Sequence, residues 1–267
     1  MMSQLFSRSA GHFALWRTLV QQDLAVKYRG TLLGRAWPLL MPLMMLAIYG
    51  FVFGAVFRAR WPGLASDDHL GFALNLFLGL LVHGLLAEAV GQAPSLFHRN
   101  SNFVRKIVFP LPVLVAVPLG AALVHMVVGV LLVCAVNAIW GSGWQWQTLA
   151  LPLVLTPYLL MLYGISLAFA ALGVYLRDLA QIVSVLVMLV LFTGTVFYPR
   201  AMVPSVFAGV VDANPISWPT DALRALVLSG QLPEAMPLAG YTLTAAVVLL
   251  LGAFLFRALR PGFADVL

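Results

Sequence analysis

Long apolar runs recur along the whole chain, and the first of them sets the scale. Residues 37–57 contain no Asp, Glu, Lys or Arg over twenty-one positions. At a rise of 1.5 Å per residue, a helix of that length spans roughly 30 Å, which is the thickness of the hydrocarbon core of a bilayer. This run is therefore predicted to be a membrane-spanning helix.

Five further apolar runs follow the first one. They cover about 70–90, 110–139, 149–175, 182–198 and 238–256, and Arg177 with Asp178 marks a short turn between the fourth and fifth spans. Apolar residues make up 62% of the 267 residues, far above the roughly 45–50% that is usual in soluble domains. Lipid is thus the natural solvent for most of the chain, and the predicted fold is an all-α integral membrane protein with six transmembrane helices.

The basic residues set the predicted orientation. Six spans put both termini on one side, and the side richer in Lys and Arg faces the cytoplasm. With the N-terminus inside, the cytoplasmic segments hold eleven of the fifteen basic residues: Arg8, Arg17, Lys27, Arg29, Arg35, Arg99, Arg105, Lys106, Arg177, Arg257 and Arg260. We therefore predict a cytoplasmic N-terminus (1–36), a six-span domain (37–256) and a cytoplasmic tail (257–267). The cations are scattered and form no single stripe, so nucleic acid is not an expected partner.

The N-terminal segment carries a helical pattern. Phe13, Trp16, Val20, Leu24 and Tyr28 recur at steps of three and four, while Arg17, Gln21 and Gln22 lie off that line. This spacing predicts an amphipathic helix over residues 13–28 that lies along the cytoplasmic membrane surface.

The segment between the fifth and sixth spans is too interrupted to cross the bilayer. Residues 199–237 contain six prolines. Within them, "NPISWPTDALRALVLSG" (214–230) predicts a short outer-face helix with Ser217 or Thr220 as N-cap and Gly230 as its stop. Leu223, Leu226 and Val227 are expected to be its buried residues.

Motifs for catalysis or nucleotide binding are missing from the sequence. It has no G-x-x-x-x-G-K-[ST] phosphate loop, no H-E-x-x-H or G-x-S-x-G, and no Cys/His metal spacing. His83 and Glu88 are the best candidates for a buried acid/base pair, but a spacing of five puts them about 140° apart around a helix, which favours packing or interfacial roles. Asp67, Asp68 and His69 are interpreted as a solvated turn rather than a metal site. The single cysteine, Cys134, is interpreted as a packing residue.

Two groups of residues suggest helix packing and a ligand path. Gly50 and Gly54 form a small-xxx-small pair that allows two helices to approach closely. Aromatic side chains gather in the first and fifth spans, and they are candidates to line a channel: Tyr49, Phe53, Phe57, Phe192, Phe197 and Tyr198.

The stretch "HRNSNFVRKIVFP" (98–110) concentrates Arg99, Arg105 and Lys106 between two spans. Three cations on a cytoplasmic loop satisfy the positive-inside rule. A merely solvated loop would carry polar and turn residues, whereas apolar residues interleave with these charges. They are Leu96, Phe97, Phe103, Val104, Ile107, Val108 and Phe109. The pattern indicates a short apolar-plus-basic helix that docks against a partner, with its apolar residues carrying the docking.

Four blocks together resemble the permease subunits of type-2 ABC exporters of bacterial surface polysaccharides. They are "DLAVKYRGTLLGRAWPLLMPLMMLAIYGFVFGAVF" (23–57), "NSNFVRKIVFPLPVLV" (100–115), "LGVYLRDLAQIVSVLVMLVLFTGTVFYPRAMVP" (172–204) and "NPISWPTDALRALVLSG". They fall in the family's order and nearly span the chain. The resemblance implies an inner-membrane homodimer, bound to two copies of a cytoplasmic ATPase that supplies ATP and Mg. It also implies that lipid-linked capsule or O-antigen polysaccharide passes between the protomers, with envelope export proteins as further partners. No cofactor is expected in this chain.

The resemblance also implies roles for particular segments. Residues 96–109 match the ATPase-coupling helix, for which the expected contact residues are Leu96, Phe97, His98, Arg99, Phe103, Val104, Arg105 and Lys106. Residues 13–28 match the interface helix, and the expected contact residues there are Phe13, Trp16, Arg17, Val20, Lys27, Tyr28 and Arg29. Residues 199–230 match re-entrant gate helices at the outer mouth.

Two other functions stay open at this point. The same architecture could export a lipid or a hydrophobic drug instead of a glycan. A membrane-embedded enzyme would use His83, Glu88 or His98 and would turn over without ATP.

Overall fold

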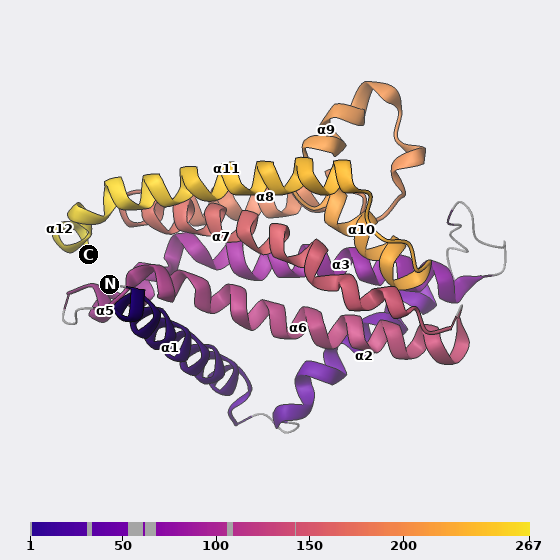
Figure 1. Cartoon of the computed structure of the whole chain (residues 1–267), viewed down its shortest axis with the longest axis horizontal. Coiled ribbons are helices and arrows are strands. Elements are labelled where there is room, and N and C mark those ends of the chain that lie inside the picture. The colour runs from indigo at the N-terminus through magenta and orange to yellow at the C-terminus, as the bar shows by residue number, and fades with distance from the viewer. Residues whose placement is uncertain (1, 31–33, 53–60, 62–67, 106–108, 142) are drawn as a thin grey trace.

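The computed structural model describes residues 2–30, 34–52, 61, 68–105, 109–141 and 143–267, and in this part of the chain every regular element is helical. The long helices lie roughly along one axis, with the two termini at one end and α9 and α10 at the other (Figure 1). Their bounds are α1 Met2–Tyr28, α2 Trp37–Tyr49, α3 His69–Gln92, α6 Leu111–Trp140, α7 Leu151–Tyr175, α8 Leu179–Thr193 and α11 Ala235–Leu259. The short helices are α4 Leu96–Arg99, α5 Ser101–Arg105, α9 Ala208–Ala213, α10 Ser217–Leu228 and α12 Phe263–Val266.

Four helical segments in the described residues are long and apolar enough to cross a membrane: His69–Gln92, Leu111–Trp140, Trp146–Tyr175 and Ala235–Val266. They match the predicted second, third, fourth and sixth spans. Trp37–Val52 and Leu179–Thr193 are shorter apolar helices at the places of the first and fifth spans. The structure thus confirms an all-helical membrane protein, and residues 53–57 of the first predicted span lie outside the described residues.

Local sequence explains where several helices begin. Proline occupies the first turn of α2, α6 and α7, where its missing N–H has no helical partner to lose. Asp68 caps α3 by accepting a hydrogen bond from the Gly71 N–H at 2.7 Å. Asp68 and His69 therefore belong to a helix start, and no group of three metal-ligating side chains occurs among the described residues.

The predicted fifth span was misplaced by a few residues. Helix α8 begins at Leu179, directly after the turn at Arg177 and Asp178, and it ends at Thr193 rather than at residue 198. Gly194 leaves the helix with extended backbone angles. The apolar run gave no sign of this helix end, because residues 194–198 contain no charged residue. These residues are instead held by partners from elsewhere in the chain.

Helix α3 forms the centre of the bundle. Residues 72–79 are buried on every side, and they pack against α6, α7, α8 and α10 in one hydrophobic cluster. Tyr158 of α7 is fully buried and donates its hydroxyl to the Val82 carbonyl at 2.8 Å. A second cluster at the end near the termini joins α4, α7, α11 and α12 through Phe97, Phe256 and Phe263. The molecule therefore has a deep core around α3 and a smaller one under the chain ends.

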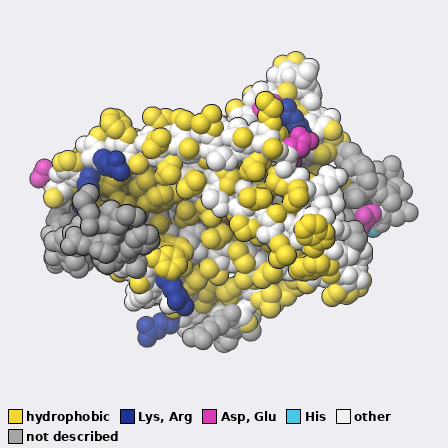
Figure 2. Space-filling model, viewed as in Figure 1, with side chains coloured by type: hydrophobic (Ala, Val, Ile, Leu, Met, Phe, Trp, Pro, Cys, Tyr) yellow, Lys and Arg dark blue, Asp and Glu magenta, His cyan; other side chains and the backbone are white. Residues whose placement is uncertain are grey.

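Much apolar surface is left uncovered. In the most apolar stretch of Ala235–Val266, only 11% of the residues are buried. Large apolar side chains of α8 and α11 are exposed, and Figure 2 shows how much of the surface is hydrophobic. Such a surface fits lipid or a protein partner, and water would disfavour it.

Candidate functional site

The predicted coupling segment follows directly on α3. A 3₁₀ turn leads into α4, Asn100 interrupts the helix, and α5 resumes at Ser101. The prediction of one continuous helix over residues 96–109 was therefore wrong. Asn100 has non-helical backbone angles, and its side-chain amide donates to the Leu96 carbonyl at 2.9 Å, which caps the end of α4. The side chains of Val104 and Arg105, and all of Lys106, lie outside what the structure describes.

The apolar residues of α4 face the protein itself. Leu96 and Phe97 are buried, and the Phe97 ring lies 6.0 Å from Phe256 and 5.3 Å from Phe263 between ring centroids. These two residues therefore hold the segment in place, which corrects the prediction that the segment's apolar side chains as a group carry the docking. His98 and Arg99 are exposed, and Phe103 is half-buried against Phe109.

Helix α4 is tied tightly to α7 and α11. His98 Nε2 lies 3.0 Å from the Gly173 carbonyl oxygen of α7. A Cβ on Gly173 would meet Pro94 backbone atoms, so the two chain segments approach as closely as their backbones permit. The segment around α4 therefore contacts α7 directly, and it contacts α11 through the Phe97 ring cluster.

The predicted interface helix packs on α6. Trp16 Nε1 donates to the Ala116 carbonyl at 2.9 Å, and Trp16 and Val20 press against Gly120 of α6. Arg17 and Arg29 are exposed, and so is Phe13, which contacts the Trp16 ring. Helix α1 begins at Met2, eleven residues before the predicted start. The prediction began too late because the first residues of the helix lack the periodic apolar stripe that marked residues 13–28.

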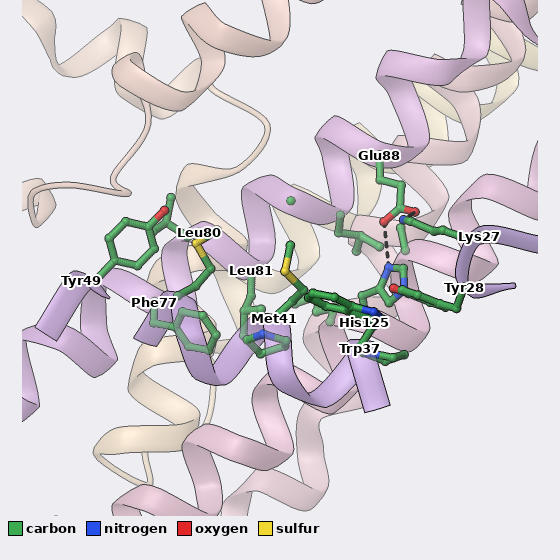
Figure 3. Close-up of a pocket in the computed structure, with 17 residues that line it drawn as sticks. Lys27, Tyr28, Trp37, Met41, Tyr49, Phe77, Leu80, Leu81, Glu88 and His125 are labelled. Carbon is green, nitrogen blue, oxygen red and sulfur yellow. Dashed lines mark hydrogen bonds and ion pairs between the residues drawn. The ribbon is translucent and has the colours of Figure 1, made fainter. Parts of the chain in front are cut away.

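A polar network fastens the end of α1 to α3 and α6 (Figure 3). Glu88 pairs with Lys27 Nζ at 2.8 Å and with His125 Nδ1 at 2.9 Å, and the Tyr28 hydroxyl lies 2.9 Å from His125 Nε2. A neutral His125 that carries its proton on Nδ1 donates to Glu88 and accepts from Tyr28. Burial raises the pKa of the Tyr28 hydroxyl, which keeps it a proton donor at neutral pH.

Next to this network lies a cavity of about 560 Å³ between α1, α2, α3 and α6. Its wall is largely apolar, with Trp37, Met41 and Phe77 among the lining residues, and Lys27, Glu88 and His125 supply its polar part (Figure 3). The position of His125 in the middle of an apolar helix was the sequence signal that could have revealed this network.

The candidate acid/base residues do not converge. His83 Nε2 contacts the Val187 carbonyl of α8 at 3.1 Å, whereas Glu88 is held by Lys27 and His125. His98 contacts α7. The separation of His83 from Glu88 confirms the expectation from their spacing, and the three residues build no common catalytic centre.

We expect Glu88→Gln to loosen α1 from the bundle by about 1 kcal/mol, because the amide keeps the shape but loses the charge that pairs with Lys27 and that strengthens the hydrogen bond from His125. Lys27 is half-exposed, which limits the loss. Hydrogen exchange of the amides of residues 16–28 should accelerate by roughly fivefold. Glu234→Gln, at an exposed carboxylate in the other end of the molecule, is the control. Equal exchange in the two variants would contradict this role of Glu88.

At the opposite end, Arg224 is the most heavily hydrogen-bonded side chain of α10. It donates through Nε to the Asn75 carbonyl at 2.8 Å, through Nη1 to that of Thr195 at 2.5 Å, and through Nη2 to that of Val196 at 2.7 Å. Asp221 lies 3.4 Å away, and the guanidinium stands 4.5 Å over the Trp61 ring. Burial lowers the pKa of Arg224 to about 10, so it stays charged at neutral pH. The sequence marked Arg224 only as a charge outside the spans.

The predicted outer helix is present, but its cap is different. Leu223, Leu226 and Val227 are buried as expected, and Gly230 follows the helix with φ of 64°. Ser217 and Thr220 do not cap it. They lie inside the first turn of α10, whose N-cap residue is Ile216, and no side chain caps the helix. Asn214 Oδ1 accepts from the Ile216 N–H at 3.0 Å, which orders the turn just before the helix.

The aromatic channel candidates fall into two places. Phe192 and Phe197 stack at 5.5 Å between ring centroids, and the Tyr198 hydroxyl donates to the Phe192 carbonyl at 3.1 Å, so these three form one group at the end of α8. Tyr49 packs against the main core. Phe53 and Phe57 lie outside the described residues, as does Gly54. A Cβ on Gly50 would meet Ala73 at 3.7 Å, which is an ordinary contact.

A close helix crossing in the described residues involves other glycines. A Cβ on Gly164 of α7 would lie 2.6 Å from the Leu249 Cα of α11, and one on Gly252 would lie 2.7 Å from the Gly164 carbonyl carbon. These two glycines are 88 residues apart in the sequence, so no local pattern identifies them as a pair.

Comparison with known proteins gives one family and several relatives. The ABC-2 type transporter family model matches residues 14–228. Two proteins of Klebsiella pneumoniae, each named O-antigen export system permease protein RfbA, are 26% and 25% identical over 262 residues, which is 96% of this chain and 95% of each relative. A Myxococcus xanthus protein of the same name is 27% identical over 250 residues, or 93% of both chains.

Proposed function

The chain belongs to the ABC-2 type transporter family, and we propose that it is the membrane permease subunit of an ATP-driven exporter of lipid-linked surface polysaccharide, either O antigen or capsule. The observation that carries this proposal is the family match over residues 14–228, together with similarity to O-antigen permeases along nearly the whole chain. The apolar helices place the transporter in a membrane, and the proposed location is the bacterial inner membrane.

The energy source in this proposal is a separate ATPase. The sequence has no phosphate loop, so ATP and Mg belong to the partner, and two ATPase copies serve two copies of this chain. The ATPase binds the end of the molecule that contains both termini, where α4 presents His98 and Arg99. Contacts of α4 with α7 and α11 support a direct mechanical path from the ATPase into the bundle.

The six-span topology is part of the same proposal. The short helices α2 and α8 complete the first and fifth spans, and both termini face the cytoplasm, where eleven of the fifteen basic residues would lie. The exposed apolar surface of the protomer supports a homodimer, with the polysaccharide channel between the two copies. Envelope export proteins would receive the polymer at the outer mouth, formed by residues 199–230.

The test is charge reversal in the coupling segment. Changing Arg99, Arg105 and Lys106 together to Glu should reduce co-purification of the partner ABC ATPase by at least about tenfold and stop polysaccharide export, because repulsion replaces attraction at the docking face. The matched control reverses three other cations of the predicted cytoplasmic side: Arg177, Arg257 and Arg260. Undiminished ATPase binding and export in the first variant would refute the docking role.

A further inference from the structure

The segment between α8 and α11 encloses a cavity of about 530 Å³ that the proposed transport cycle does not yet use. Its wall comes from the turn at Arg200, from α9 and α10, and from the residues that lead into α11. This volume lies within the roughly 300–1,000 Å³ of ligand pockets in proteins. The cavity lies at the end of the molecule opposite the termini, in the region where charged side chains of both signs gather in Figure 2.

One wall of the cavity is an aromatic platform. Trp218 lines the cavity, and Tyr241 of α11 stacks on it with 4.6 Å between ring centroids and 23° between ring planes. Tyr241 is not part of the lining, and its hydroxyl donates to the Pro215 carbonyl at 2.8 Å, so it holds the indole in a fixed position at the cavity wall. A rigid aromatic surface of this kind binds the apolar C–H face of a sugar ring.

The rest of the wall offers hydrogen-bonding groups. Asp221, Gln231 and Glu234 line the cavity, and carboxylates accept while an amide both donates and accepts. Ser217 also lines it; this residue is 4% exposed, and its Oγ is buried without a hydrogen-bond partner. Its Oγ is closed to the cavity as it is to solvent, so the accessible hydrogen-bonding groups of the wall are those of Asp221, Gln231 and Glu234. Sugar hydroxyls suit this wall, because each can donate and accept.

The charges of the site favour an uncharged ligand. Arg200 is paired with Asp212, and Asp221 contacts Arg224, which leaves Glu234 as the excess charge. An acidic saccharide would be repelled by Glu234 and would find both nearby arginines already paired.

We propose that this cavity is a saccharide subsite at the outer end of the permease, which holds a few residues of an uncharged glycan against Trp218. This inference rests on the proposed function, because it assigns the outer mouth a place where the exported polymer pauses. Trp218 is the stacking surface, and Gln231 and Glu234 bind the ring hydroxyls.

The experiment measures binding to the full permease–ATPase complex in lipid nanodiscs by isothermal titration calorimetry. The probe is a tetrasaccharide prepared by mild acid release and trimming of the surface polysaccharide of the source strain. The variants are Trp218→Leu and Glu234→Gln, and the latter changes an exposed residue that should not affect folding. Trp146→Leu, at an exposed tryptophan that does not line the cavity, is the matched control.

We expect saturable binding to the parent and to Trp146→Leu, weakened by at least about fivefold in both cavity variants. Absence of binding to the parent, or equal binding in all variants, would overturn the subsite. Export of polysaccharide by the parent in cells is measured separately. Export without the binding pattern removes only the subsite, whereas the binding pattern without export leaves the subsite standing and removes the proposed function.

Discussion

Replacing Gly252 with alanine should strongly destabilise the protein, although the same change elsewhere in α11 should be harmless. Glycine in a helix interior costs about 1 kcal/mol relative to alanine, so helix propensity alone predicts a gain. At Gly252 the new Cβ would instead meet the carbonyl carbon of Gly164 at 2.7 Å and its Cα at 3.0 Å. These are backbone atoms of α7, and they cannot move aside as the end of a flexible side chain would.

The cost is that of overpacking at a rigid contact, about 3 kcal/mol or more, because the two helices have to separate along their crossing. The measurement is the thermal midpoint of the purified permease, followed by size-exclusion chromatography of heated samples. Gly240→Ala is the matched control, since Gly240 lies in the same helix and has open space around its Cα. It should leave the midpoint unchanged or raise it. Equal midpoints for the two variants would show that α7 and α11 do not cross this closely.

The length of the apolar runs predicted the long helices well, because an apolar run of this length shows that the segment lies in lipid. The spans at 70–90, 110–139 and 149–175 match helices that begin and end within a few residues of these bounds. A helix that crosses lipid needs about twenty consecutive, mostly apolar residues, so each such span is visible in a short stretch of the sequence. Leu223, Leu226 and Val227 were predicted to be buried for a related reason, since their spacing puts them on one face of a helix.

The misplaced features depend on contacts between distant segments. Helix α8 stops at Thr193, and the carbonyls of Thr195 and Val196, just beyond it, accept from Arg224, which lies about thirty residues further along the chain. The coupling segment breaks at Asn100, where a side-chain hydrogen bond competes with the helix. Neither helix end coincides with a change in hydrophobicity, so the pattern of apolar runs cannot predict it.

The sequence identified several residues of the site, but it did not identify which residues they contact. Lys27 and Tyr28 were identified as part of an interface helix, and Glu88 as an unusual charge within a span. That Glu88 joins Lys27 to His125 follows only from the way α1 packs on α6. For Leu96 and Phe97 the sequence also left the contact partner open, because an apolar residue between two spans can face another protein or the protein's own core. Their burial under α11 and α12 decides for the core.

Arg224→Met should disrupt the outer end of the molecule more than any change of an exposed charge. The guanidinium supplies hydrogen bonds to the carbonyls of Asn75, Thr195 and Val196, and none of these three bonds is helical. A buried carbonyl that loses its donor costs about 1–3 kcal/mol, and the carbonyls of Thr195 and Val196 lie outside any helix, so losing both donors costs several kcal/mol. Arg224→Lys keeps the charge but cannot reach three carbonyls at once, and it should lie between the parent and Arg224→Met.

Limited proteolysis distinguishes this role from a general effect of losing an arginine. Cleavage between residues 194 and 230, mapped by mass spectrometry, should rise sharply in Arg224→Met, since the carbonyls of Thr195 and Val196 then lose the guanidinium that joins them to α10 and α3. The control is Arg200→Met, in the same segment, where the exposed pair with Asp212 is worth only about 0–1 kcal/mol. If both variants resisted the protease equally, hydrophobic packing of Leu223, Leu226 and Val227 alone would hold α10. The guanidinium would then be dispensable. A higher cleavage rate in Arg224→Met alone means that one buried cation fixes the end of α8, the start of α3 and the outer helix to each other.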